Sequence, residues 1–383
     1  MDAILGDCSL DRLRSRKSFK WRTHPADVLP LFVAEMDFDP AEPIKAAVRA
    51  ALDLGDCGYP HKGELGEVFT QFAADRLGWS PDPDLVFAIP DVMTGIAEVI
   101  QAVTEPGAGV VINPPVYAPF FFRLELAGRR IVEAPLAAGP DGCYEMDLDA
   151  LDSALGQPGV GAYLICNPHN PLGRMWTRAE LTAVAEVCAR HDVPVLADEI
   201  HAPLVLAGAS HVSFHTVEHE VARRAIVFTS ASKGWNIPGL KCGIAVVATP
   251  QGAAILEERW EALLASHLGV LATIAALRDA RPWLDAVVGQ IDANAVLLGK
   301  LLGEHLPAVG FRQPQASFLA WLDCRELGLG DDPAAVFLDR GRVALSPGPD
   351  FGSQGRGFAR LNMGTSPELL AEAVRRMAAA LAA

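Results

Sequence analysis

The sequence predicts an α/β fold in which a larger domain carries a mostly parallel sheet and a smaller α/β domain accompanies it. The chain has 383 residues, half of them apolar, which is too long for one small core. Apolar runs at residues 160–166, 193–197 and 226–229 indicate buried strands. Asn170, Asp198 and Lys233 follow these runs and are 28 and 35 residues apart, about the length of a βαβ unit. We therefore expect the three side chains at one edge of one sheet, where open α/β sheets bind ligands.

Hydrophobic periodicity and turn signals place the other elements. We expect further strands at residues 86–89, 109–112, 131–134, 242–247, 318–322, 343–345 and 358–361. We expect helices at about 44–54, 63–77, 91–103, 120–126, 178–190, 251–267, 268–280 and 282–305, with a last helix from 365. Residues 1–45 are expected to form an N-terminal arm and a segment of the small domain, 46–285 the large domain and 286–383 the small domain. The basic residues before about 30 indicate a solvated arm, and residues 348–357 a flexible glycine-rich loop.

Charge and composition exclude several function classes. The formal net charge of −15 and the pI near 5.1 argue against nucleic acid or an anionic membrane surface as a partner. The seven cysteines form no C-x-x-C pair and no His/Cys cluster, which indicates reduced thiols in the cytoplasm and no metal site. We find no signal peptide and no uncharged apolar stretch of about 18 residues, so no membrane span is expected.

The run from Ile226 to Gly243 delivers a lysine to the end of a buried strand. The chain has only seven lysines against twenty-five arginines, so Lys233 at this position is less readily explained as an ordinary surface lysine. A desolvated lysine favours the neutral amine, which can attack an aldehyde and form an imine. Pyridoxal phosphate (PLP) is the aldehyde cofactor that fits, with Ser230, Ser232 and Lys241 as donors and positive charge for its phosphate. The alternative is an ordinary surface lysine at a strand end.

The pattern Ser230-x-Ser232-Lys233-x5-Gly239-x-Lys241-x-Gly243 resembles the Schiff-base signature of the class I/II aminotransferase superfamily, fold type I. This resemblance implies the aspartate aminotransferase fold, with a mixed seven-stranded sheet, a PLP cofactor bonded to Lys233 and a homodimer. It also implies that Asn170 donates to the 3′ oxygen of the cofactor and that Asp198 keeps the pyridine nitrogen protonated. Further cofactor contacts follow from the same resemblance: stacking by Tyr117, phosphate binding by the helix start at Met93 and Thr94, 3′ oxygen or Asp198 contact by His201, and contact of Tyr59 with the phosphate of the neighbouring subunit.

Two more segments concern the substrate. Arg360-Leu361-Asn362 resembles the R-L-N motif, whose arginine binds the substrate carboxylate with a bidentate fork. Residues 29–38 resemble the P-L-W-V-A-D-M-D-F segment of the cystathionine β-lyase-like branch, the PatB/MalY-like C-S lyases. In that branch the segment, which includes Ala34 here, borders the substrate carboxylate. For most of these residues a local structural role is the alternative, such as a packed tyrosine, a helix cap or a paired arginine.

The resemblance implies a C-S β-lyase that acts on L-cystathionine or a related cysteine S-conjugate and yields pyruvate, ammonia and a thiol. Gly234 and Trp235 depart from the Thr-Phe pair that usually follows the lysine. An aminotransferase of class I/II is the second interpretation, and a regulatory binding protein that uses the fold is the third. Among these, the intact set of Lys233, Asp198, Asn170 and Arg360 favours an enzyme.

Overall fold

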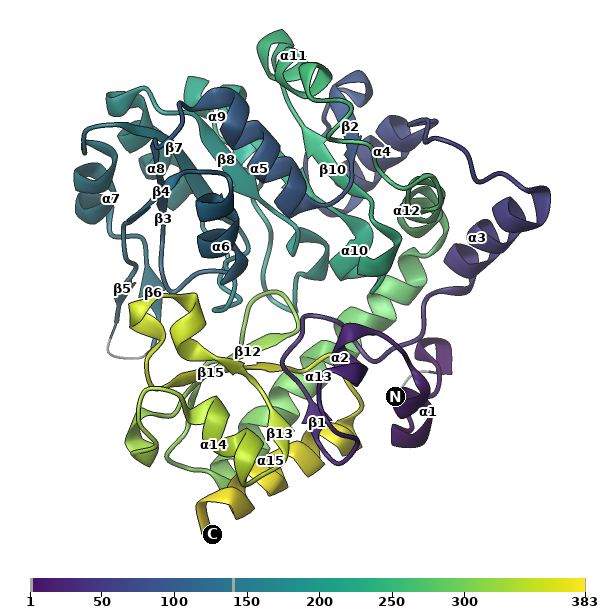
Figure 1. The fold of residues 1–383 in the computed structure, drawn as a ribbon, viewed down its shortest axis with the longest axis vertical. Helices are drawn as coiled ribbons and strands as arrows, with labels where there is room; N and C mark the ends of the chain where they lie inside the picture. The colour runs from purple at the N-terminus through teal and green to yellow at the C-terminus, as the bar shows by residue number, and fades with distance from the viewer. Residues whose placement is uncertain (1–2, 140–141, 383) are drawn as a thin grey trace.

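A seven-stranded mixed sheet forms the centre of the larger part of the molecule, as predicted (Figure 1). The computed structural model describes residues 3–139 and 142–382. The strand order is β2-β10-β9-β8-β7-β3-β4, and β10 alone runs antiparallel to its neighbours. The strands are β2 (Val86–Ile89), β3 (Gly109–Ile112), β4 (Arg130–Glu133), β7 (Val160–Cys166), β8 (Val195–Asp198), β9 (Ile226–Thr229) and β10 (Gly243–Val246).

Helices cover both faces of this sheet because alternate strand residues are apolar on both sides. Leu164 packs into a core with α5 (Val92–Val103) and α6 (Pro119–Leu126), whereas its neighbour Ile165 packs into the core on the opposite face. The second core includes α8 (Arg178–His191), which begins at the predicted capping box of Thr177 and Glu180. The other helices around the sheet are α3 (Glu42–Leu54), α4 (Leu65–Arg76), α7 (Leu148–Leu155), α9 (Glu220–Arg224), α10 (Ala231–Gly234), α11 (Pro250–Glu258) and α12 (His267–Asp279).

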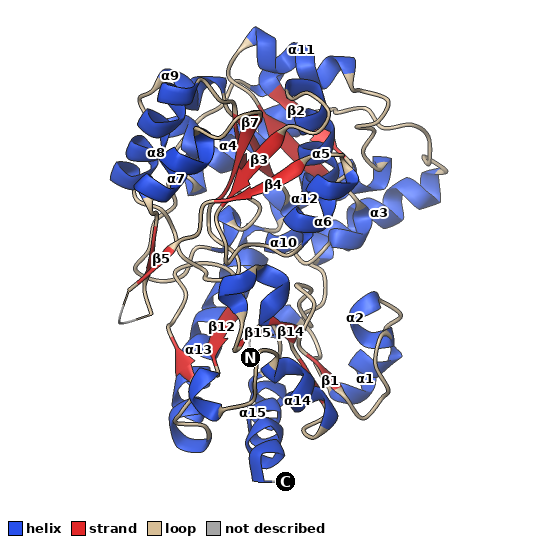
Figure 2. Ribbon diagram, turned by 60° about the vertical axis from the view of Figure 1, so that its left-hand side comes forward, coloured by secondary structure: helices blue, strands red, loops and turns tan. Residues whose placement is uncertain are grey.

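A smaller antiparallel sheet lies below the first in Figure 2. Its order is β11 (Gly310–Phe311), β12 (Leu319–Asp323), β15 (Phe358–Asn362) and β14 (Ser346–Pro347). Three helices accompany it: α13 (Arg281–His305), α14 (Pro333–Asp339) and α15 (Pro367–Ala382). Two short pairs complete the strands, β1 (Leu29–Pro30) with β13 (Val343–Ala344) and β5 (Ala137–Ala138) with β6 (Tyr144–Glu145). The domain boundaries at 45 and 285 stay a prediction.

Helix α13 passes, by length and composition, as a membrane-spanning candidate, and no other helix of the described ranges does so. It packs against α15 and α12 instead of standing apart. Asn294 near its middle is fully buried and donates to the carbonyls of Met363 and Thr365. These contacts identify α13 as a core helix that links the two parts of the chain.

One local prediction was wrong. The N-terminal segment is not a solvated arm: it forms α1 (Leu10–Ser15) and α2 (Phe19–Arg22), and Lys20 is fully buried because its Nζ lies 2.8 Å from Asp37 Oδ1. Residues 348–357, predicted as a flexible glycine-rich loop, contain two short 3₁₀ helices (Gly348–Phe351 and Ser353–Gly355), and their flexibility stays a prediction. Phe351 is buried there because it packs against Trp321 and the guanidinium of Arg360.

Candidate active site

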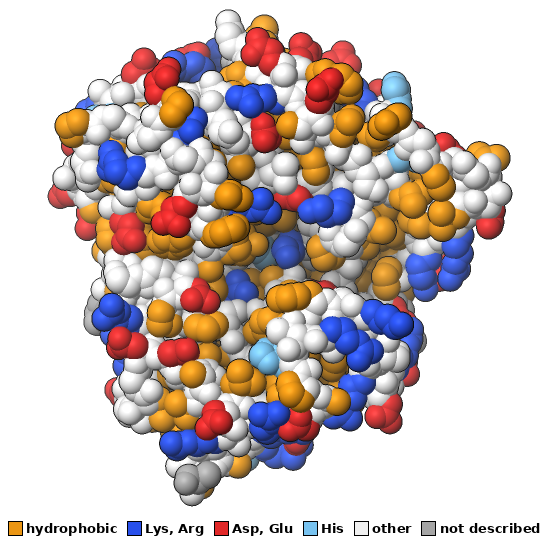
Figure 3. Space-filling view, in the orientation of Figure 1, with side chains coloured by type: hydrophobic (Ala, Val, Ile, Leu, Met, Phe, Trp, Pro, Cys, Tyr) orange, Lys and Arg blue, Asp and Glu red, His pale blue; other side chains and the backbone are white. Residues whose placement is uncertain are grey.

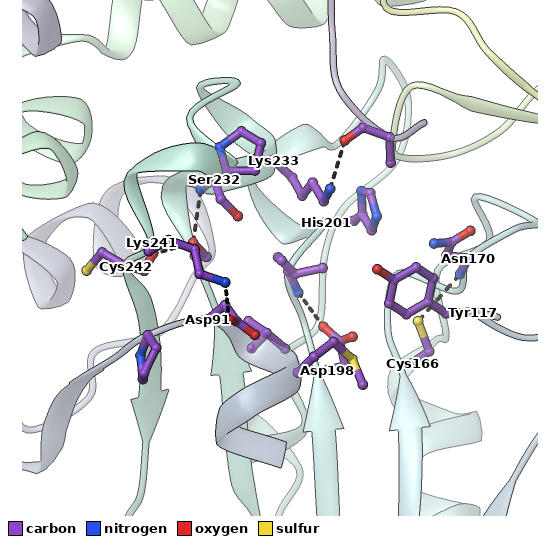
Figure 4. Close-up of a pocket in the computed structure, with 17 residues that line it drawn as sticks. Asp91, Tyr117, Cys166, Asn170, Asp198, His201, Ser232, Lys233, Lys241 and Cys242 are labelled. Atoms are coloured by element: carbon purple, nitrogen blue, oxygen red, sulfur yellow. Dashed lines mark hydrogen bonds and ion pairs between the residues drawn. The ribbon is translucent and has the colours of Figure 1, made fainter. Parts of the chain in front are cut away.

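A pocket of about 160 Å³ lies at the carboxyl ends of β7, β8 and β9 (Figure 4). Cys166 pairs with Asp198 and Asp198 with Phe228, so the three parallel strands end at the same level. Figure 3 shows a hollow between the two parts of the molecule, with Lys or Arg side chains inside it. The pocket is lined by ten of the predicted site residues: Ala34, Met93, Tyr117, Asn170, Asp198, His201, Ser230, Ser232, Lys233 and Lys241.

Lys233 lies in the short helix that follows β9. Ser230 caps this helix: its Oγ accepts from the Ser232 N–H at 3.0 Å and donates to the Cys242 carbonyl at 2.7 Å. Lys233 Nζ donates to the carbonyl of Ala34 at 2.7 Å. Burial, helped by the nearby Arg360, lowers the pKa of Lys233 to about 8. The amine is therefore easier to deprotonate than an exposed lysine, which suits both a nucleophile and a base.

Asp198 ends β8 and faces the same pocket (Figure 4). Its Oδ1 accepts from the Ile200 N–H at 3.1 Å. Burial raises the pKa of Asp198 to about 7, against the opposing effects of this hydrogen bond and of Lys233. A protonated ring nitrogen next to this buried carboxylate would stabilise its ionised form.

Lys241 and the start of α5 lie at the end of the pocket that is opposite Asn170 and Tyr117 (Figure 4). Asp91 caps α5 by accepting from the Thr94 N–H at 2.8 Å and from the Thr94 hydroxyl at 3.0 Å. Lys241 Nζ forms an ion pair with Asp91. Thr94 itself is not among the lining residues, whereas Met93 is. A cation, the hydroxyl of Ser232 and a helix N-terminus thus meet where an anion would be stabilised.

Arg360 lies behind Asn170 and does not line the pocket itself. Its Nη1 donates to Asn170 Oδ1 at 3.1 Å, and its Nη2 donates to the Phe32 carbonyl at 3.1 Å and to Ser346 Oγ at 3.0 Å. Arg360 Nε is buried and has no hydrogen-bond partner among the described residues. The residue therefore keeps a donor available for a further acceptor.

Of three other predicted residues, Tyr117 and His201 line the pocket and Tyr59 does not. Tyr117 lines the pocket, and burial raises its pKa to about 12. His201 is buried beside it; burial, with Lys233 and Arg360 nearby, lowers its pKa to about 3, and its Nδ1 has no hydrogen-bond partner in the part of the chain that is described. Tyr59 does not line the pocket of its own chain and is 91% exposed.

The donor set fits PLP. The pocket offers an amine for an aldehyde, a carboxylate for a ring nitrogen, an amide for a phenolic oxygen, and a cation with the hydroxyl of Ser232 for a phosphate. The buried, unpartnered Nδ1 of His201 also needs an acceptor or donor that a bound group would supply. No group of three or more potential metal ligands occurs within residues 3–139 and 142–382.

Several residues that contribute to the site were not predicted from the sequence. Cys166 lines the pocket, and Asp91 forms an ion pair with Lys241. Ser346 accepts a hydrogen bond from Arg360. Asn236 forms hydrogen bonds with the backbone of residues 36–38. Asp91 had a usable signal, since an aspartate three residues before a helical N–H is a common cap. The others act through contacts between distant segments, which no local pattern shows.

Comparison with known proteins gives consistent matches along nearly the whole chain. Residues 26–377 match the family model "Aminotransferase class I and II". A Mycobacterium tuberculosis protein provisionally named a cystathionine beta-lyase is 45% identical, with 98% of each chain covered. Cystathionine beta-lyase PatB of Bacillus subtilis is 36% identical, with 93% of each covered. The crystal structure of cystalysin from Treponema denticola, which contains PLP, is 27% identical with a TM-score of 0.91 and covers 96% of this chain and 97% of that one.

Proposed function

The chain belongs to the aminotransferase class I and II family, and from this premise we propose that it is a PLP-dependent carbon-sulfur β-lyase. The observation that carries the proposal is the convergence of Lys233, Asp198 and Asn170 on one pocket with Arg360 bonded behind it. Relatives that are 36% and 33% identical, from Bacillus subtilis and Corynebacterium glutamicum, are named cystathionine beta-lyase. Cysteine thioethers such as L-cystathionine are the substrate class that we infer.

PLP, when bound, supplies the aldehyde that takes up an amine and the ring that withdraws electrons from the substrate Cα. The chain's own residues do the rest. Asp198 stabilises positive charge at the ring nitrogen, because a buried carboxylate next to a cation is favourable where an unpaired one is not. Asn170 would donate an N–H of its side-chain amide to the 3′ oxygen of the cofactor, because its Oδ1 already accepts a hydrogen bond from Arg360. Lys241, Ser232 and the N-terminus of α5 would hold the phosphate.

Lys233 is the residue that we assign to the proton transfer. Its lowered pKa of about 8 leaves an appreciable fraction of the amine neutral near physiological pH. Arg360 binds the substrate carboxylate and so orients the Cα–H bond toward this amine. The pocket lining consists largely of neutral residues such as Ala34, Tyr117 and Ile200. These walls limit access of water to the reacting carbon.

What happens after proton removal separates a lyase from an aminotransferase. Loss of the β-sulfur releases a thiol and leads to pyruvate and ammonia, whereas a transaminase needs a keto acid to complete its cycle. The test is pyruvate and thiol release from L-cystathionine in the absence of any keto acid. Product formation supports the lyase; strict dependence on a keto acid with no thiol moves the assignment to an aminotransferase.

We further propose that the enzyme works as a homodimer with a shared active site. A set of large apolar side chains lies exposed on the larger part of the chain, namely Leu52, Leu54, Tyr59, Trp260 and Leu264. Hydrophobic side chains also gather over the α3 region at the right of Figure 3. Such patches mark interaction surfaces, and a second copy would place Tyr59 against the neighbouring phosphate site. Among the described residues, Cys8, Cys57, Cys166, Cys188, Cys242 and Cys324 carry free thiols, which fits the cytoplasm as the proposed location.

A further inference from the structure

Residues 33–38, which we call the strap, pass beside Lys233 without forming a helix or strand. Side chains from three distant segments satisfy the backbone of the strap. Asn362 Nδ2 donates to the carbonyls of Val33 and Glu35, both at 2.7 Å. Lys20 Nζ donates to the backbone carbonyl of Glu35 at 3.0 Å. The strap is thus held in place by specific hydrogen bonds, since it has no ladder of its own.

Asn236 provides the third anchor of the strap. Its Oδ1 accepts from the Met36 N–H at 2.8 Å, and its Nδ2 donates to the carbonyls of Met36 at 2.8 Å and Phe38 at 3.1 Å. Asn236 adopts a φ of 57°, in the left-handed region that asparagine tolerates better than most residues. It follows Lys233 by three positions, so the segment that carries the amine is also the segment that grips the strap.

These contacts place one acceptor on the lysine. The Ala34 carbonyl, 2.7 Å from Lys233 Nζ, lies on the strap two residues before Met36. An amine that donates one N–H to a fixed carbonyl has its rotation restricted, and its lone pair then has a defined direction. Restricting a base in this way contributes to rate because a small misplacement of reacting groups is costly.

We propose that Asn236 is a positioning residue that holds the Ala34 carbonyl against the free Lys233 amine and so aims that amine at the substrate Cα. The inference rests on the proposed lyase function. In the step concerned, the Cα–H bond breaks, its proton bonds to Lys233 Nζ, and its electron pair stays with the substrate and cofactor. Asn236 touches neither substrate nor cofactor; it acts through the strap.

The test uses Asn236→Gly, which removes all three hydrogen bonds while a glycine keeps the left-handed backbone without strain. Asn236→Ser, which can keep at most one or two of the bonds, gives a graded second variant. The control is Asp192→Gly, which makes the same kind of change at a left-handed residue (φ 48°) that ends α8. Thermal unfolding verifies that each variant is folded.

The first readout is independent of catalysis. The full chain, stripped of cofactor, is pulse-labelled with acetic anhydride across pH, and mass spectrometry reports the midpoint for Lys233. The charged groups that act on Lys233 are Arg360, Glu35 and Asp198, and none is a hydrogen-bond partner of Asn236. Lys20 and Asn362 still bond to Val33 and Glu35 in the variant, so the strap is not released as a whole and the charged groups stay in place. The expected effect of losing Asn236 is a looser, weaker contact between the Ala34 carbonyl and the ammonium. We expect the midpoint to fall by about half a pH unit or more in Asn236→Gly and by less in Asn236→Ser.

The second readout is kinetic. In the holoenzyme we expect kcat of Asn236→Gly to fall by about 10- to 100-fold with KM within about threefold, and the Cα-deuterium isotope effect to rise. An unchanged or raised labelling midpoint, an unchanged kcat, or equal effects in Asp192→Gly would each overturn the proposal. Absence of pyruvate from the wild-type chain would instead refute the lyase function, while the labelling midpoint would still test Asn236 by itself.

Discussion

Arg360 Nη1 donates to Asn170 Oδ1 at 3.1 Å in a buried contact that joins the smaller sheet to the edge of the larger one. The two residues are 190 positions apart in the chain. Through this bond the proposed carboxylate-binding residue and the proposed cofactor-binding residue fix each other's side-chain orientation. A change in either is therefore expected to affect binding at both.

Arg360→Lys is expected to raise KM for the thioether substrate more than it lowers kcat. Lysine keeps the charge but loses the fork, and hydrogen bonds to charged groups contribute about 1.5–3 kcal/mol each, which corresponds to roughly 10- to 100-fold. Steady-state kinetics measure the effect. Arg278→Lys is the control, because Arg278 is half-exposed and pairs with Glu64 at the surface. Equal KM values for the two variants would contradict the assignment.

Lys233→Ala is expected to abolish the absorbance of the lysine–cofactor bond and to reduce turnover by at least about 10³-fold, since both nucleophile and base are removed. Lys300→Ala, at a lysine whose side chain is 70% exposed, is expected to change neither. Absorbance spectra and pyruvate assays on the same samples give the comparison. Turnover that survives in Lys233→Ala would exclude the proposed mechanism.

Asp198→Asn is expected to stabilise the cofactor-free chain more at pH 8 than at pH 5. Burial raises the pKa of Asp198 to about 7. At pH values between its pKa in the unfolded chain and 7, the carboxyl group is therefore protonated in the folded chain and ionised in the unfolded one. Wild-type stability from this group is therefore present at low pH and lost as pH rises through 7. Asparagine avoids that loss, which amounts to about 2–3 kcal/mol over the interval from pH 5 to 7.

Urea unfolding at the two pH values measures this difference. Asp152→Asn is the opposite control, because His191 and Arg190 hold the pKa of the exposed Asp152 below its usual value. A stabilisation by Asp198→Asn that does not grow with pH would show that the carboxyl group is not the cause.

Lys20→Met is expected to destabilise the chain by about 3–5 kcal/mol, because it leaves the buried Asp37 carboxylate without its cation. The double variant Lys20→Met, Asp37→Asn removes the unpaired charge and is expected to recover part of the loss. Chemical denaturation of Lys20→Met, of Asp37→Asn and of the double variant reports the free energy of unfolding of each. If the double variant were as unstable as the sum of both single variants, the pair would not be coupled.

The predictable part of the structure is the part that local pattern controls. Seven strands of the large sheet were placed within a few residues, and Asn170, Asp198 and Lys233 meet as the βαβ spacing implies, because parallel strands of one sheet end at one edge. The strap was recognised only by its resemblance to a family segment. Its bonds to Asn236, Asn362 and Lys20 join positions up to 329 residues apart, which no periodicity reveals.

The N-terminal segment shows why the remainder could not be predicted. A run of basic residues ordinarily indicates a solvated face, and Arg22 there is indeed exposed. Lys20 is buried because Asp37, 17 positions later, supplies a carboxylate and Glu35 a backbone carbonyl for its ammonium. Composition does not show which charges pair in space, so the burial of Lys20 could be seen only in the three-dimensional structure.

The shared active site predicts complementation between two inactive chains. Tyr59→Ala lacks the tyrosine that we assign to the neighbouring phosphate site, and Lys233→Ala lacks the amine, so each homodimer is expected to be impaired when cofactor is limiting. In a mixed dimer, the Lys233 of one chain meets the Tyr59 of the other, and one of its two sites is intact. Random co-assembly makes about half of the dimers mixed, so about a quarter of all sites are native. Co-expression with two affinity tags, followed by assays of pyruvate release at limiting PLP, is expected to give about that fraction of wild-type activity. Activity no higher than that of Tyr59→Ala alone would show that Tyr59, exposed as it is in the single chain, does not serve the partner.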